Sequence, residues 1–171
     1  MKKIITIFMA ALTPAFFATP AAAALSNFYV GAKLGTDHIG LGGSIDSPVA
    51  SGMFGGFKID PNWAVEAGYL DLNGGPSGQD SFIASDISAV GFYPTDDQFS
   101  WFGKIGIANY DKEGFSLSLS GKTLTFELGG QLDIGKSGGA RFSYDYHNYK
   151  SPTTSEKVNS SLFCISGIFK F

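Results

Sequence analysis

The sequence has little that could support cross-linking or redox chemistry. Cys164 is the only cysteine among 171 residues, so no disulfide can form within the chain. The alternating pattern of residues 159–171 places Cys164 on the same face as polar side chains. We therefore expect it to fill space inside the fold and not to act as a nucleophile.

The chain also lacks runs of basic residues. Its formal net charge is −3, and loss of Lys2 and Lys3 with a leader would leave 10 basic and 15 acidic residues, or −5. Such a chain is not expected to bind nucleic acid. It has no metal-ligand cluster or cofactor motif, and residues 40–43 lack the Lys and helix that a phosphate-binding loop needs. We expect no metal and no cofactor.

A long apolar run occurs only at the N-terminus. Lys2 and Lys3 precede apolar residues 4–18, which Pro14 interrupts, and small residues follow at 20–24. This order is typical of a secretory signal peptide, so we predict a signal peptide over residues 1–23 and one domain over 24–171. A membrane anchor is less favoured, because a spanning helix needs roughly 18–20 uninterrupted apolar residues.

In the rest of the chain, apolar and polar residues alternate. In residues 121–134, Leu124, Phe126 and Leu128 share one face, and Thr125, Glu127 and Gln131 share the other. Successive side chains of a strand point to opposite faces. The pattern recurs, so we predict a sheet with a wide apolar face free of charge and a narrow polar face.

Eight segments of this kind occur, at residues 27–35, 48–59, 63–72, 81–93, 99–110, 121–134, 140–149 and 159–171. Each approaches or exceeds the roughly 9–11 residues of a membrane-spanning strand. Connections at 60–62, 94–98 and 135–139 are short, and those at 36–47, 73–80, 111–120 and 150–158 are longer and polar. We predict an all-β fold, an eight-stranded antiparallel up-and-down transmembrane β-barrel with both termini in the periplasm.

A soluble β-sandwich is the alternative. It would leave Lys33, Glu66, Lys104 and Arg141 on a solvated face, but it needs a second layer that no remaining segment supplies. A barrel instead turns its apolar face to outer-membrane lipid and lipopolysaccharide. Aromatic residues at the short-turn ends should form a girdle there: Trp63, Tyr93, Phe99, Phe169 and Phe171.

The connection between the fifth and sixth segments has two possible registers. In one, Ser120 and Gly121 form the hairpin tip and residues 111–114 form a bulge. In the other, residues 111–114 form the turn and the sixth strand carries a bulge near Gly121.

Charges of both signs occupy the inward positions: Lys33, Lys58, Glu66, Asp86, Lys104, Glu127, Asp133, Arg141, Asp145 and Lys170. Eight strands enclose only enough space for side chains. We therefore predict that an ion-pair network fills the interior, with inward glycines making room for the long side chains.

Several strings resemble outer membrane protein A and its relatives. Residues 28–35 (FYVGAKLG) resemble the opening strand, and residues 54–61 (FGGFKIDP) with 66–69 resemble the second hairpin. Residues 93–97 resemble a later periplasmic turn, and 140–144 the seventh strand. Residues 169–171 (FKF) fit the terminal aromatic signal, Phe169 and Phe171, that the barrel-assembly machinery reads.

The resemblance implies an eight-stranded barrel with an interior contact between Glu66 and Arg141. It departs from the family at Val90, where a basic residue is expected, and at Ser143, where a carboxylate is expected but Asp145 follows two residues later. It also implies periplasmic chaperones as partners and a monomer. The larger members of the family carry a periplasmic peptidoglycan-binding domain, which we do not expect here because the sequence stops at the last strand.

Three functions are consistent with this sequence. We favour a structural or barrier protein of the outer membrane, or a narrow porin-like one, without catalysis. A lipid A-modifying barrel enzyme would need a base and a nucleophile in contact. Its candidates are His38, His147, Ser47, Ser151 and Asp145, which no triad spacing connects. A surface adhesin is the third alternative, and the short polar loops favour it less.

Overall fold

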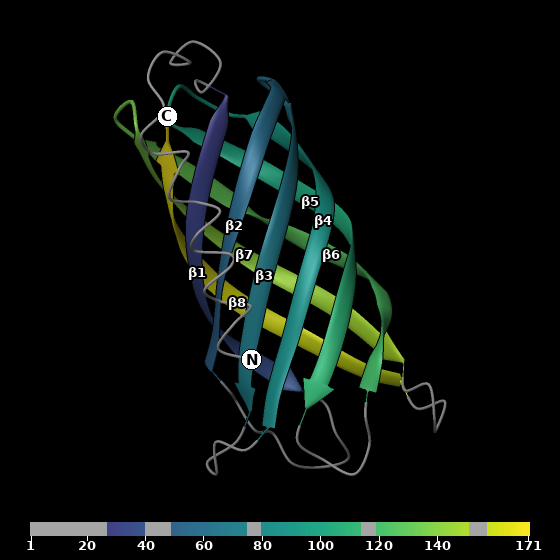
Figure 1. The fold of residues 1–171 in the computed structure, drawn as a ribbon. Helices are drawn as coiled ribbons and strands as arrows, with labels where there is room; N and C mark the ends of the chain where they lie inside the picture. The colour runs from purple at the N-terminus through teal and green to yellow at the C-terminus, as the bar shows by residue number, and fades with distance from the viewer. Residues whose placement is uncertain (1–26, 40–48, 75–79, 114–118, 151–156) are drawn as a thin grey trace, which may run out of the picture.

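The computed structural model describes residues 27–39, 49–74, 80–113, 119–150 and 157–171. They form a single antiparallel barrel (Figure 1). Its strands are β1 (Phe28–Ile39), β2 (Val49–Asp60), β3 (Trp63–Gly74), β4 (Asp80–Pro94), β5 (Phe99–Glu113), β6 (Leu119–Ile134), β7 (Gly138–Lys150) and β8 (Lys157–Lys170). The predicted signal peptide lies outside the described residues.

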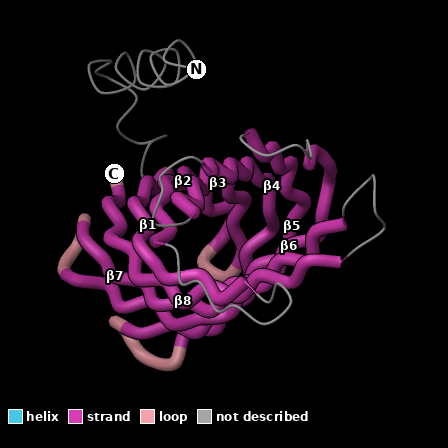
Figure 2. The backbone as a smooth tube through the Cα atoms, turned by 90° about the horizontal axis from the view of Figure 1, so that it is seen from below, coloured by secondary structure: helices cyan, strands magenta, loops and turns pink. Residues whose placement is uncertain are grey.

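The barrel closes because β1 pairs with both β2 and β8. Lys33 is the Cα partner of Gly52 on one side and of Ser166 on the other, and Figure 2 shows the resulting ring of strands. Every strand pairs with its neighbours in sequence, so the sheet has no free edge. The predicted fold class is confirmed. Within the described segments, no helix has the length and apolar character that a membrane span requires.

The strands are longer than predicted at the end opposite the short turns. β1 continues from Gly35 to Ile39, and β5 continues to Glu113. Both proposed registers for the following hairpin are wrong, because Tyr110 pairs with Gly121 and Asp111 with Ser120 in an unbroken ladder. In a long ladder, backbone N–H and C=O groups that a loop would leave to water pair with the neighbouring strand. The polar composition of these residues does not reveal that pairing.

The short turns are closed by local hydrogen bonds. Asp60 Oδ1 accepts from the backbone N–H groups of Asn62 and Trp63 at 2.7 and 2.8 Å, and Asp96 does the same for Gln98 and Phe99 at 2.8 and 2.7 Å. Gly135 begins the third turn with a φ of 66°, a conformation that glycine adopts without steric cost. We call this end of the barrel, where the C-terminus also lies, the turn end, and the opposite end the loop end (Figure 1).

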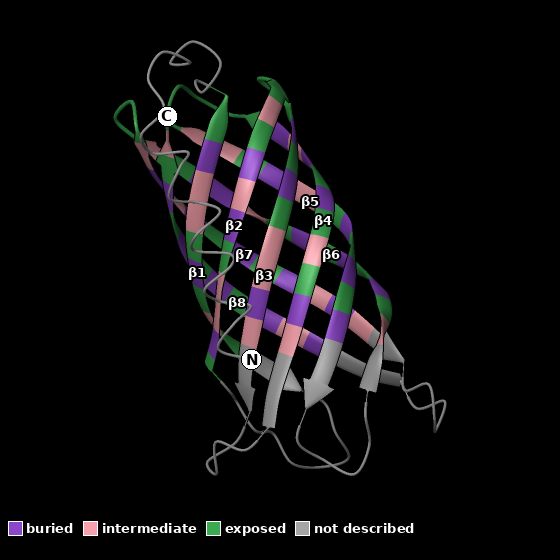
Figure 3. Cartoon of the chain, viewed as in Figure 1, coloured by how far each residue is buried: buried purple, intermediate pink, exposed green. Residues whose placement is uncertain are grey.

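Exposed and buried residues alternate along the strands (Figure 3). Large apolar side chains lie on the outside, and Leu128 is 68% exposed near the middle of β6. The outward apolar positions of β6 run from Leu124 to Ile134, a height of about 25 Å for a tilted strand. This equals the apolar band of outer-membrane barrels, roughly 25 Å.

The prediction of an outward face without charge is wrong at two positions. Asp71 and Lys122 share the outward face of their strands with Tyr69 and Leu124, respectively. Both lie beyond the apolar band, toward the loop end, where a charge can reach water. The expectation therefore fails only at the rim.

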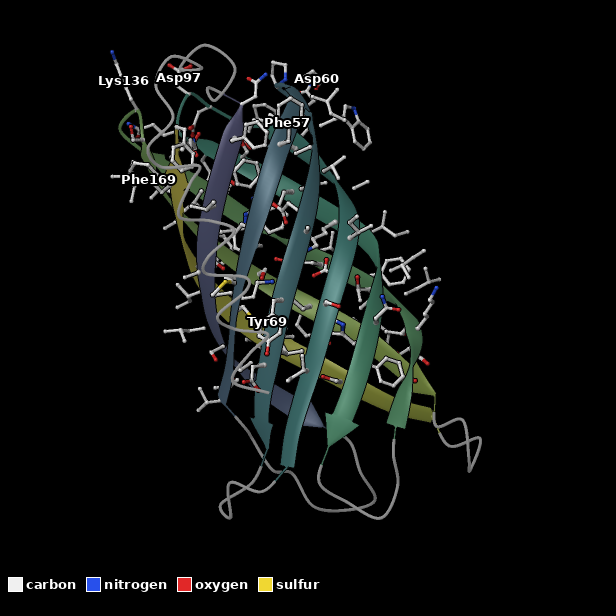
Figure 4. All side chains as sticks on the ribbon, in the orientation of Figure 1. Phe57, Asp60, Tyr69, Asp97, Lys136 and Phe169 are labelled. Carbon is white, nitrogen blue, oxygen red and sulfur yellow. The ribbon has the colours of Figure 1, made fainter. Side chains whose placement is uncertain are left out.

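Aromatic residues gather at the turn end, as expected for a girdle. Figure 4 places Phe57 and Phe169 near Asp60, Asp97 and Lys136, whereas Tyr69 lies toward the other end. Phe99, Trp101 and Phe142 form one outward cluster, with ring centroids 5.2–6.2 Å apart. Two of these rings, Phe99 and Phe142, cover the space over Gly130, where a Cβ would collide with them. Glycine is thus needed beneath the rings.

A charge in the middle of the apolar band should be far more costly than one at the rim. Leu128→Arg should cost about 2–4 kcal/mol, whereas Asn109→Arg, on an outward position near the loop end, should cost about 0–1 kcal/mol. The measurement is the urea midpoint of each variant refolded into lipid vesicles. Equal midpoints for the two variants would show that Leu128 does not face lipid at mid-depth.

Candidate functional site

The interior of the barrel, here called the lumen, is filled by side chains in three layers. An apolar layer toward the loop end contains Ala50, Leu70, Ala84, Tyr110, Leu162 and Cys164. A mostly aromatic layer toward the turn end contains Tyr29, Phe54, Ala64, Val90, Phe92, Phe102 and Ile168. Charged side chains from six strands lie between and within these layers.

Arg141 and Glu66 make the central contact. Arg141 Nη1 donates to Glu66 Oε1 at 2.7 Å, and both side chains are about 1% exposed. They come from β7 and β3, which are four strands apart in a ring of eight and so face each other across the lumen. Tyr29 donates its hydroxyl to the same oxygen at 2.7 Å. Gln131 accepts from Arg141 Nε and Nη2 at 3.3 and 2.9 Å.

Four aromatic rings surround the Arg141 guanidinium, and we did not foresee this from the sequence. Its carbon atom lies 4.4 Å from the ring centre of Phe102, 5.0 Å from Phe54 and 5.8 Å from both Tyr29 and Phe92. Contacts of this kind attract a cation electrostatically. The alternation placed these residues inward, but nothing in it indicated that they meet at one arginine.

Inward glycines make space for two of these rings. A Cβ on Gly31 would overlap the Phe54 ring, and a Cβ on Gly56 would overlap the Tyr29 ring. Inward glycines were predicted to make room for long charged side chains. Gly31 and Gly56 make room instead for rings around Arg141.

Two lysines hold the remaining central carboxylates. Lys33 Nζ lies 2.7 Å from Asp145 and 2.9 Å from Glu127. Lys104 Nζ lies 3.0 Å from Asp86, 3.4 Å from Glu66 and 3.7 Å from Glu127. These contacts join Lys33, Lys104 and Arg141 with four carboxylates in one connected network. Each carboxylate has at least one cationic partner, as buried charges require.

The two departures from the family pattern are compensated in space. Val90 is fully buried and is the Cα partner of Lys104 on the next strand. The ammonium therefore comes from β5 where the pattern would take it from β4. Ser143 donates a hydrogen bond to Asp145 Oδ1 at 2.8 Å, so serine orients the carboxylate that stands two residues further along.

Asp133 and Lys170 form a separate pair near the turn end. Their side chains are 2.5 Å apart and partly exposed. Gln131 Nε2 also donates to Asp133 at 2.9 Å and so links this pair to Arg141. Phe169 and Phe171 point outward beside them, with ring centroids 5.2 Å apart.

Two of the residues proposed for an enzyme, Asp145 and His147, share the inward face of β7 and line one cavity. His147 is buried on the inward face of β7, opposite Ser160 of β8, and Asp145 is engaged by Lys33 and Ser143. His38 is the Cα partner of Ser161 on β8, and Ser47 and Ser151 lie outside the described residues. Cys164 is buried, and its thiol lies 3.9 Å from Asp145.

Comparison with known families identifies one match. The family described as outer membrane protein beta-barrel domain matches residues 8–169, nearly the whole chain. No curated protein sequence is similar enough to count as a match.

Solved structures share the fold at low sequence identity. Neisserial surface protein A aligns with a TM-score of 0.75 and 15% identity over 85% of this chain and 98% of that one. The attachment invasion locus protein Ail of Yersinia pestis aligns at 0.56 and 15% over 84% and 96%. The outer membrane enzyme PagL aligns at 0.54 and 12% over 81% and 97%. At these identities the likeness shows the fold alone.

Moving the ammonium between the two paired positions tests the compensation at Val90. Lys104→Val leaves Glu66, Asp86 and Glu127 with fewer partners, and breaking buried pairs costs about 3–5 kcal/mol. Adding Val90→Lys should recover part of that loss, whereas Val90→Lys alone should destabilise. Urea midpoints in lipid vesicles measure all three. A double variant no more stable than Lys104→Val would mean that the two positions are not interchangeable.

Proposed function

Because this chain belongs to the outer membrane protein beta-barrel domain family, we propose that it is a structural protein of the outer membrane. Its barrel stays closed to ions and carries out no catalysis. In this proposal the signal peptide directs export, the turn end faces the periplasm, and the outward apolar side chains contact lipid and lipopolysaccharide. Periplasmic chaperones and the barrel-assembly machinery, which would read Phe169 and Phe171, are the proposed partners of a monomeric barrel.

The filled lumen is the observation that supports this function most strongly. The charged network lies against an apolar layer on each side, and the cavity beside it has a volume of only about 40 Å³. A permeating ion would have to cross both apolar layers and separate buried ion pairs, which is energetically costly. A porin-like conduction path is therefore less favoured than a barrier role.

A lipid-modifying enzyme has less support. Substrate acyl chains lie outside the barrel, but His147 and Ser160 are buried on inward positions. His38 lies opposite Ser161 in the ladder, a second pairing of a histidine with a serine on neighbouring strands. An adhesin would act through connections that fall outside the described residues.

Planar-bilayer recording tests the closed lumen. We expect no steady current from the wild-type protein, because side chains fill its interior. Phe54→Ala/Phe102→Ala removes two rings from the aromatic layer and should introduce an ion current. Phe126→Ala/Phe142→Ala removes two outward rings and should leave the lumen closed. A reproducible open state in the wild type would contradict the barrier role.

Acyl analysis of lipid A tests the enzyme alternative. Cells that produce wild type, His38→Ala or His147→Ala should have the same lipid A acyl pattern as cells without the protein. The physical reason is that the buried His147 cannot reach a lipid ester. A pattern that changes with the wild type and reverts with either variant would establish catalysis.

A further inference from the structure

A small cavity adjoins the central network on its loop-end side. Its volume is about 40 Å³, enough for about three water-sized occupants. Carboxylates, ammonium groups, an imidazole and a hydroxyl contribute to its wall, from five different strands: Lys33, Asp86, Lys104, Thr125, Glu127, Asp145 and His147.

Two oxygen atoms in this wall have no hydrogen-bond partner: Thr125 Oγ1 and Glu127 Oε1. Thr125 is only 4% exposed and Glu127 only 5%. The second oxygen of Glu127 is held by Lys33 at 2.9 Å and Lys104 at 3.7 Å, so the carboxylate is fixed with Oε1 left over. Leaving buried oxygens unsatisfied is costly, and a ligand in the cavity would satisfy both.

The cluster around the cavity also has one excess negative charge. Within the described residues, it joins Glu66, Asp86, Glu127 and Asp145 to Lys33, Lys104 and Arg141, or four carboxylates to three bases. Two further lysines do not correct the balance. Lys170 is paired with Asp133, and Lys58 lies over the Phe92 ring at 5.0 Å, in the aromatic layer.

We propose that this cavity binds one monovalent alkali cation, together with water. Carboxylate and hydroxyl oxygens are the ligands that hard cations prefer, and one positive charge would neutralise the cluster. A chelated divalent ion fits less well, because no three acidic, His or Cys side chains of the described residues are placed to hold a metal. The site does not depend on the proposed barrier function.

A cation that binds only the folded barrel must stabilise it in a saturable way. The test compares urea midpoints of the protein in lipid vesicles in NaCl, KCl and choline chloride at equal ionic strength. We expect a higher midpoint in an alkali salt than in choline, with saturation as the alkali concentration rises. Equal midpoints in all three salts would overturn the proposal.

Two variants and a matched control locate the effect. Thr125→Val keeps the shape and the charge but removes one unpartnered oxygen, and Glu127→Gln removes the excess charge. Each should abolish the difference between alkali and choline. Thr123→Val is the control, because Thr123 lies on the same face of β6 but already donates to the Asn148 carbonyl and does not line the cavity. An undiminished alkali effect in Thr125→Val would refute the site even if Glu127→Gln fails to fold.

Crystals soaked in a thallium(I) salt provide the direct readout. An anomalous peak beside Glu127 Oε1 and Thr125 Oγ1 would support the site. A cavity with ordered water and no anomalous peak would show that water alone satisfies the two oxygens, and the proposal would be wrong.

Discussion

The contact between Glu66 and Arg141 organises the interior of this barrel. It joins strands on opposite sides of the ring, and both partners are almost wholly buried. A guanidinium in such a place must have its charge and its donors satisfied. Glu66, Gln131 and four aromatic rings together meet that requirement. Gly31 and Gly56 are in turn needed because the rings occupy the space above them.

The outside of the barrel explains why so many charges are inside. Outward positions within the apolar band face a medium in which a charge is expensive, so Asp71 and Lys122 lie only at its rim. An eight-stranded ring leaves no room to hydrate the inward charges fully. They are therefore paired with one another, and the paired side chains fill the lumen.

The pairing of the interior charges depends on where they lie in space more than on their sequence positions. Lys104 supplies an ammonium beside Val90, and Asp145 supplies a carboxylate beside Ser143. Neighbouring positions of a ladder lie about 5 Å apart, a distance that a long side chain easily covers. A motif comparison position by position would have concluded that the second ion pair was missing, although two lysines and three carboxylates assemble there.

Alternation along the chain by itself determined the class of fold, the number of strands, the short turns and which side chains face inward. These features follow from local rules, since the alternation within each strand distinguishes its apolar face from its polar face. Only the closed structure decided which inward residues meet. Arg141 finds Glu66 from four strands away, and the register of β5 with β6 continues past the point where composition suggests a loop. The stagger between the strands of the closed barrel decides which residues come into contact. That stagger is a property of all eight strands together, so no single segment reveals it.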